Sequence, residues 1–212
     1  KEPIGVVAAI SAFNHPFNLA VHQVIPAIAV GCPVIIRPAT QTPMSAIKLV
    51  ELLKEAGLPD GWAQAVVCDR QGGELLVTSP KTAFFTFIGS GPVGWYLNSK
   101  ASAGTRSALE HGGVAPVIVE PDADIEAMIP DLVKGGFYHA GQVCVSVQRI
   151  FVHESIADSV ASKIAEKASK LVVGDQLDPK TEVGPLINHN EVNRVEEWVN
   201  DAVAKGGKIL TD

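Results

Sequence analysis

Cys144 lies in the stretch HAGQVCVSVQR, between two valines and shortly after Gly141 and Gln142. A cysteine thiolate is a strong nucleophile, so this side chain could attack an electrophilic carbon of a substrate. A free cysteine also serves often as a small buried hydrophobic side chain, and the stretch by itself is compatible with both uses. The two other cysteines, Cys32 in VGCPVII and Cys68 after an apolar run, are predicted to be structural.

A glycine-rich stretch is the second candidate for chemistry. FFTFIGSGPVGWY contains Gly89, Gly91 and Gly94 in G-x-G-x-x-G spacing, between an expected strand and an expected helix, and Glu110 follows downstream. In a dinucleotide-binding fingerprint such glycines let the backbone approach a pyrophosphate, and a downstream acid binds the ribose. That fingerprint belongs to the first strand–helix–strand unit of its fold, whereas several units precede this stretch, so the standard Rossmann assignment is disfavoured.

Charge and composition exclude several classes of function. The chain of 212 residues has 17 basic and 23 acidic residues, a formal net charge of −6 and no basic cluster, so neither nucleic acid nor an anionic membrane is an expected partner. The longest apolar runs, such as VIPAIAVGCPVII, are interrupted by glycine and proline, and no membrane span is expected. Three cysteines without a C-x-x-C pair argue for a reducing, cytoplasmic location and against disulfides and metal sites.

The elements that must position these residues alternate between short apolar runs and helix-length amphipathic runs. We expect strands at 4–10, 33–38, 62–68, 83–88, 105–110, 115–120 and 146–154, helices at 18–31, 42–57, 72–79, 92–101, 122–136, 155–174 and 189–207, and a turn and strand in GGKILTD. This alternation predicts an α/β fold: a Rossmann-like parallel sheet with crossover helices, followed by part of a second α/β domain. The boundary is expected near Gly112–Gly113.

Several motifs, taken together and in order, resemble the NAD(P)-dependent aldehyde dehydrogenase superfamily. They are SAFNHPF (11–17), IIRPATQTP (35–43), FIGSGPVG (87–94), LEHGGVAPVIV (109–119) and GQVC (141–144). The resemblance implies that residues 1–111 are most of a cofactor-binding domain and that 112–212 begin a catalytic domain. It also implies that the chain is a central fragment, with N- and C-terminal segments of its parent missing.

The resemblance also implies a role for each of three side chains. Cys144 would add to the aldehyde carbonyl, and the amide of Asn14 with the backbone N–H of Cys144 would stabilise the oxyanion. After hydride transfer to the nicotinamide, Glu110 would activate the water that hydrolyses the thioester. Each has a structural alternative, since Asn14 could be a turn residue and Glu110 a solvated strand end. His111 and His139 are left outside the catalytic set.

Contacts with NAD or NADP are implied by the same resemblance at eleven positions. They are Ile10, Ala12, Phe13, Arg37, Thr40, Gly73, Gly89, Ser90, Val93, His111 and Gly112. Relatives usually carry lysine in place of Arg37, and those that prefer NAD carry glutamate in place of Thr40. Because Thr40 removes a negative charge and Arg37 could pair with a 2′-phosphate, we expect NADP at least to be tolerated. Ala12, Phe13 and His111 replace a common proline, tryptophan and leucine.

Two other functions remain open from the sequence. A CoA-acylating relative would transfer the acyl group to coenzyme A, but such enzymes generally lack the glutamate, so Glu110 favours hydrolysis. A truncated fragment could instead be inactive, binding nucleotide weakly or associating with itself. The expected partner is a small aldehyde whose identity the sequence does not specify, and superfamily members are usually homodimers or homotetramers.

Overall fold

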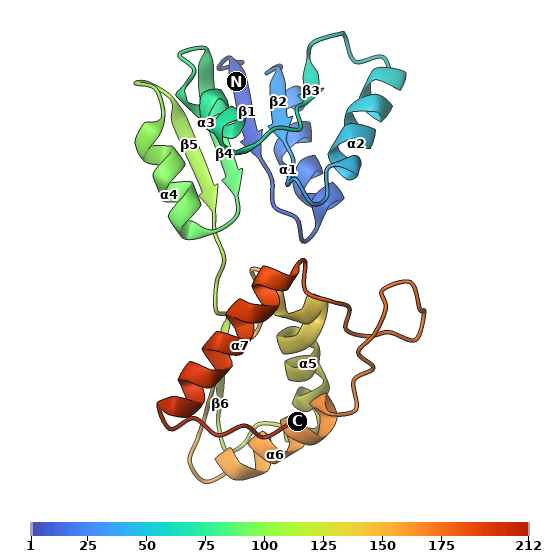
Figure 1. Cartoon of the computed structure of the whole chain (residues 1–212), viewed down its shortest axis with the longest axis vertical. Coiled ribbons are helices and arrows are strands. Elements are labelled where there is room, and N and C mark those ends of the chain that lie inside the picture. The colour runs from blue at the N-terminus through green and yellow to red at the C-terminus, as the bar shows by residue number, and fades with distance from the viewer. Residues whose placement is uncertain (1, 212) are drawn as a thin grey trace. The chain divides into compact units, whose positions relative to one another are not determined.

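The computed structural model describes residues 2–211, so Lys1 and Asp212, which the expected domain limits include, lie outside the described residues. The chain folds as two compact units that divide between Gly112 and Gly113 (Figure 1). The expected limit between residues 111 and 112 lies one position away from this division.

The first unit is built on a five-stranded sheet in which every strand pair is parallel. The strand order is β3-β2-β1-β4-β5. The strands are β1 (Val6–Ile10), β2 (Val34–Arg37), β3 (Ala63–Ala65), β4 (Thr82–Ile88) and β5 (Arg106–Glu110). Parallel strands covered on both faces become continuous apolar runs, which is why VVAAI and VIIR lack a polar alternation. The predicted parallel sheet with crossover helices is confirmed.

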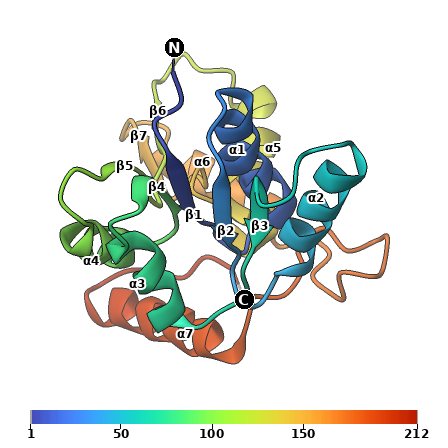
Figure 2. The ribbon, with the colours of Figure 1, turned by 90° about the horizontal axis from the view of Figure 1, so that it is seen from above.

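Four helices connect these strands: α1 (Pro16–Ala29), α2 (Met44–Glu55), α3 (Arg70–Thr78) and α4 (Gly91–Lys100). Figure 2 shows α1 and α2 together on one face of the sheet and α3 and α4 together on the other. The core under the first pair includes Val24 and Ile36, and the core under the second includes Val77 and Phe85. All four of these side chains are fully buried.

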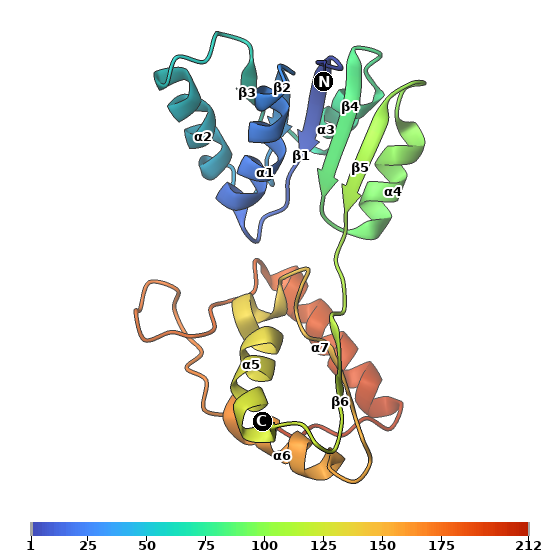
Figure 3. The same cartoon turned by 180° about the vertical axis from the view of Figure 1, so that it is seen from behind.

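The second unit contains a parallel pair of strands and helices that pack on one another (Figure 3). Its elements are β6 (Pro116–Val119), α5 (Ile125–Phe137), the short 3-10 helix η1 (Tyr138–Gly141), β7 (Arg149–Val152), α6 (Ala157–Ala168) and α7 (His189–Ala204). Ile129, Val133 and Val160 form the buried centre between α5 and α6. In contrast, no residue of α7 is buried.

Several predicted element limits are wrong. The helix expected at 155–174 ends at Ala168, and the β-branched Val173 forms an isolated bridge with Val183 instead. The strand expected at 62–68 pairs with β2 only through Ala63–Ala65. The strand expected in GGKILTD has no ladder partner among the described residues.

The helix expected at 72–79 begins earlier, at Arg70, because the Asp69 carboxylate accepts a hydrogen bond from the Gly72 backbone N–H at 2.9 Å and so caps it. No helix of the described part of the chain has the length and apolar composition that crossing a bilayer requires.

Candidate functional site

The carboxyl ends of β1 and β4 form the centre of the candidate site. These neighbouring strands send their helices to opposite faces of the sheet, and in open α/β sheets ligands bind in the crevice at such a point. Ile10, Ala12 and Phe13 lie at or just after the end of β1, and Gly89, Ser90 and Val93 lie after the end of β4. The fold therefore collects these two groups of predicted cofactor residues at one edge of one sheet.

Gln23 of α1 stabilises this edge and is not among the residues predicted from the sequence. Its Nε2 donates hydrogen bonds to the carbonyl of Ile10 at 3.1 Å and to the carbonyl of Thr86 at 3.2 Å, so one side chain connects β1 and β4. Gln23 is only 5% exposed. The available signal was a single uncharged polar residue in the apolar face of NLAVHQVIPAIAVG, since a buried amide is retained only where it finds partners.

The glycines after β4 leave space for aromatic side chains. A Cβ at Gly94 would lie 2.5 Å from Nε2 of His111 and 2.9 Å from the Phe87 ring, and a Cβ at Gly89 would lie 2.7 Å from the same ring. The Gly89 backbone N–H donates to the Glu110 carbonyl at 3.0 Å, which continues the β4–β5 pairing to the end of β5. In this structure, packing by itself already requires glycine at 89 and 94.

His111 is directed into the first unit against α4. Its ring lies edge-on to Phe87 and Trp95, with centroid distances of 6.1 Å and 5.5 Å. Its Nε2 is buried and has no hydrogen-bond partner among the described residues. The His111 side chain thus packs against aromatic rings of β4 and α4 at this edge of the sheet.

A second group of predicted cofactor residues gathers where β2 ends. The Arg37 guanidinium donates from Nη2 to the Thr40 hydroxyl at 3.1 Å and to the Cys68 carbonyl at 3.1 Å. A Cβ at Gly73 would lie 3.8 Å from Arg37 Nε and 3.8 Å from the tip of Ile10, so α3 approaches both side chains closely. The structure therefore brings Arg37, Thr40, Gly73 and Ile10 together.

Tyr96 and Glu74 join the two helices of the same face. The phenol of Tyr96 donates to the Glu74 carboxylate at 3.0 Å. This hydrogen bond and the negative charge of Glu74 raise the pKa of Tyr96 above its ordinary value of 10.0. The pKa of Tyr96 is therefore higher in the folded chain than in the unfolded chain. The interaction with Glu74 stabilises the folded chain fully at pH values below the unfolded pKa, and this stabilisation is lost as the pH rises through the folded pKa.

We expect Glu74→Gln to lower the pKa of Tyr96, since the amide removes the charge that opposes phenolate formation. The measurement is the phenolate absorbance during an alkaline titration of the 212-residue chain, in a Tyr138→Phe background in which Tyr96 is the single tyrosine of these residues. Glu51→Gln, which neutralises an exposed carboxylate that pairs with Lys48, is the matched control and should leave the titration unchanged. An unchanged titration in Glu74→Gln would show that the hydrogen bond is absent in solution.

Cys144 lies in the second unit and its side chain is exposed, whereas Cys32 is buried and Cys68 is half-buried. The alternative in which Cys144 is a buried hydrophobic residue is therefore wrong. Buried residues stand close on both sides of it, with Val143 at 8% and Ser146 at 2% exposure. The loop thus presents Cys144 and Val145 to solvent, while Val143 before them and Ser146 after them are buried.

The remaining candidates belong to the first unit. Asn14 is half-buried in the segment between β1 and α1, and the carbonyl of the preceding Phe13 accepts a hydrogen bond from the Thr42 hydroxyl at 3.4 Å. Glu110 is exposed at the carboxyl end of β5, and Gly112 follows it. The three predicted catalytic residues are thus divided, with Asn14 and Glu110 in one unit and Cys144 in the other.

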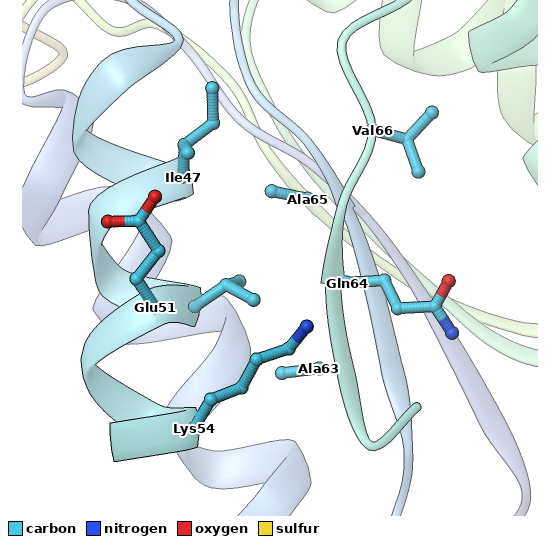
Figure 4. Close-up of a pocket in the computed structure, with 8 residues that line it drawn as sticks. Ile47, Glu51, Lys54, Ala63, Gln64, Ala65 and Val66 are labelled. Carbon is cyan, nitrogen blue, oxygen red and sulfur yellow. The ribbon is translucent and has the colours of Figure 1, made fainter. Parts of the chain in front are cut away.

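One hollow of the first unit holds none of the candidate residues. It has a volume of about 340 Å³ and lies between α2 and β3 (Figure 4). Its walls are formed by Ile47, Val50, Glu51, Lys54 and residues 63–66. Among the residues that the structure describes, no group of three or more histidine, cysteine, aspartate and glutamate side chains is arranged to hold a metal ion.

The family model of the aldehyde dehydrogenases matches residues 1–212. The chain belongs to the aldehyde dehydrogenase family. The resemblance carried by the ordered motifs is thereby confirmed. The chain is 46% identical over 210 residues to a 3-sulfolactaldehyde dehydrogenase of Priestia aryabhattai. It is 40% identical over 212 residues to a probable NADP-dependent succinate-semialdehyde dehydrogenase of Sinorhizobium fredii. These alignments cover 99% of this chain but only 44% and 43% of the two relatives.

Solved aldehyde dehydrogenase structures share the fold. A betaine aldehyde dehydrogenase from Staphylococcus aureus, in complex with NAD+ and with a BME-modified cysteine, matches with a TM-score of 0.96 at 32% identity, over 99% of this chain and 43% of that one. Glyceraldehyde-3-phosphate dehydrogenase from Methanocaldococcus jannaschii, complexed with NADP, matches with a TM-score of 0.93 at 40% identity, over 98% and 46%. The chain therefore spans less than half the length of these family members.

Proposed function

We propose that the full-length protein carrying this chain oxidises a small aldehyde to a carboxylic acid with NAD+ or NADP+, using Cys144 as the nucleophile. The observation that carries the proposal is the exposed thiol of Cys144 within GQVC, on a loop anchored by the buried Val143 and Ser146, in a chain that belongs to the aldehyde dehydrogenase family. The BME-modified cysteine of the Staphylococcus aureus relative supports a reactive thiol in this family.

The first unit offers groups that fit a dinucleotide. Arg37 contributes a guanidinium whose buried Nε has no hydrogen-bond partner among the described residues. The helix α4 begins at Gly91 without a side-chain cap, since Ser90 makes no capping hydrogen bond, so its first N–H groups and its positive dipole end are available to an anion. These residues would hold the cofactor, and a bound nicotinamide would accept the hydride from the substrate.

In the proposed first step the Cys144 thiolate forms a C–S bond to the aldehyde carbon, and the carbonyl π electrons move to oxygen. The side-chain amide of Asn14 and the backbone N–H of Cys144 would donate hydrogen bonds to that oxyanion. When the oxygen re-forms its double bond, the C–H bond breaks, the hydride leaves with its electron pair, and a thioester remains on Cys144.

Glu110 is the proposed base for the second step. It would take a proton from a water molecule that attacks the thioester carbon, and the C–S bond would break to return the thiolate and release the acid.

The direct test is turnover of the full-length protein with a panel of aldehydes. The panel follows the names of the relatives and structures: 3-sulfolactaldehyde, succinate semialdehyde, betaine aldehyde and glyceraldehyde 3-phosphate. We expect equal amounts of reduced cofactor and carboxylic acid from at least one of them. Acyl-CoA formed only when coenzyme A is added would identify the CoA-acylating alternative, and no reduced cofactor from any aldehyde would overturn the proposal.

We further propose that this protein accepts NADP, because Arg37 is positioned by Thr40 and Cys68 and no glutamate stands at position 40. Thr40→Glu should weaken NADP binding at least about tenfold relative to NAD, since a carboxylate there would repel a 2′-phosphate. The measurement is the dissociation constant of each cofactor. Gln41→Glu adds the same charge at the next exposed position and should change the ratio little; a strong NAD preference before any substitution would contradict the hypothesis.

The proposal extends to assembly and location. We propose a homo-oligomeric full-length protein in a reducing cytoplasm, the location that three cysteines without a C-x-x-C pair favour. The molar mass from light scattering tests the first statement, since a monomer at micromolar concentration would contradict it. Localisation of the tagged protein tests the second.

A further inference from the structure

The backbone immediately before Cys144 is held in an unfavourable conformation. His139 (φ 51°, ψ 34°), Ala140 (φ 54°, ψ 36°) and Gly141 (φ 74°) are three consecutive residues in the left-handed region. For residues with a Cβ this conformation is sterically unfavourable, and such strain persists only where surrounding contacts maintain it. Glycine occupies only the third position, so the contacts that hold His139 and Ala140 must be found elsewhere.

Gln142 makes such contacts with His139, the first residue of this turn. Its backbone N–H donates to the His139 carbonyl at 3.1 Å, and its side-chain Nε2 donates to the same carbonyl at 3.0 Å. The other end of the amide extends to a distant segment, since Oε1 accepts from the Ile187 backbone N–H at 2.9 Å and Nε2 lies 3.5 Å from the Pro185 carbonyl. One side chain therefore connects the left-handed turn to a segment about 45 residues later in the chain.

The chain after Cys144 is fixed independently. The hydroxyl of the buried Ser146 lies 3.2 Å from the carbonyls of both Gly135 and Gly136, and the Val147 N–H donates to the Gly135 carbonyl at 3.0 Å. A Cβ at Gly135 would lie 2.8 Å from the Val147 side chain, so the close approach to the end of α5 requires glycine. The nucleophile loop is thus anchored on its C-terminal side whatever happens at Gln142.

We propose that Gln142 is a positioning residue for Cys144, holding the strained turn 139–141 and thereby orienting the thiol and the backbone N–H of Cys144. The inference rests on the proposed role of Cys144 as nucleophile. Without the Gln142 amide, the turn can relax toward ordinary dihedral angles, and the relaxation moves the one side of the loop that Ser146 does not fix. A displacement of about 1 Å in such a group costs up to about a hundredfold in rate.

The test compares Gln142→Leu and Gln142→Glu with the unmodified full-length protein. Leucine removes all side-chain hydrogen bonds, while glutamate keeps the acceptor for the Ile187 N–H but loses the donor to the His139 carbonyl. We expect kcat to fall about tenfold to a hundredfold in both variants, with the KM for aldehyde within about twofold of its original value. We also expect iodoacetamide to alkylate Cys144 at least about threefold more slowly relative to Cys68 in the same molecule.

A second substitution separates positioning from simple destabilisation. Ala140→Gly lowers the cost of the left-handed conformation, so adding it to Gln142→Leu should restore at least about a third of the lost kcat and of the lost Cys144 reactivity. Ala115→Gly removes the same kind of left-handed strain elsewhere in the second unit (φ 31°) and should restore neither. A loss of folding stability with normal kcat per folded molecule would overturn the inference, as would equal rescue by both glycines.

The outcomes also distinguish this inference from the proposed function. If Cys144→Ser stays active, the nucleophile assignment fails and the role of Gln142 fails with it. If Cys144→Ser is inactive while both Gln142 variants keep kcat and Cys144 reactivity within about twofold of the original protein, only the positioning role is wrong.

Discussion

Cys144→Ser is expected to reduce aldehyde oxidation by the full-length protein at least about a thousandfold. Serine is close to cysteine in size, so the exposed position should accept it without a folding penalty. The serine hydroxyl, however, is far less acidic than a thiol and gives almost no anionic nucleophile near neutral pH. The measurement is the initial rate of reduced-cofactor formation at saturating aldehyde, together with the unfolding midpoint of the variant.

Cys68→Ser is the matched control, because Cys68 is half-buried and its contact with Arg37 is made through the backbone carbonyl, which serine retains. We expect this variant to keep most of its activity. Alkylation with iodoacetamide, followed by peptide mapping, gives a readout without turnover: Cys144 should react before Cys68 and Cys32, and cofactor should alter its rate. Equal reaction of all three thiols, or an active Cys144→Ser variant, would remove the basis of the proposed mechanism.

Gln23→Leu is expected to lower the free energy of unfolding by about 1–3 kcal/mol. Leucine matches the volume of glutamine, so the loss comes mainly from the Ile10 and Thr86 carbonyls, which would lose their side-chain donor in a buried place. The measurement is urea unfolding of the variant beside the original chain. Because Gln23 joins the two strands at whose ends the cofactor residues gather, weaker dinucleotide binding should accompany the loss.

Gln64→Leu provides the control for this prediction. Gln64 is exposed on the edge strand β3, and its amide donates only to the nearby Gly61 carbonyl at 3.3 Å. We expect a change within about 0.5 kcal/mol there, as for most surface substitutions. Equal losses of unfolding free energy in Gln23→Leu and Gln64→Leu would contradict the prediction. They would mean that the hydrogen bonds from Gln23 to β1 and β4 add nothing to stability beyond the loss of any glutamine.

The sequence determined the parts of the fold that repeat a simple pattern. Continuous apolar runs such as VVAAI and VIIR, separated by amphipathic helices, predicted a parallel sheet with crossovers because this burial pattern allows few alternatives. Where local contacts compete with the hydrophobic pattern, the helix limits predicted from the sequence differ from those in the structure. The Asp69 cap extended one helix toward its N-terminus, and the bridge between Val173 and Val183 replaced the last part of another helix.

The candidate site divides in the same way. The order of the motifs in the sequence indicated the aldehyde dehydrogenase family and singled out Cys144, Glu110 and Asn14, since these residues stand at fixed places within short motifs. The sequence did not indicate the amide bridges of Gln23 and Gln142, because their partners are backbone groups on strands and loops far away in the chain. The exposure of Cys144, the packing of His111 on Gly94 and the left-handed turn before the thiol were likewise decided by tertiary contacts alone. Hydrophobic patterns and the order of motifs are properties of residues that are close in the sequence. The burial of a side chain and the strain of its backbone depend instead on distant segments that the folded chain packs against it.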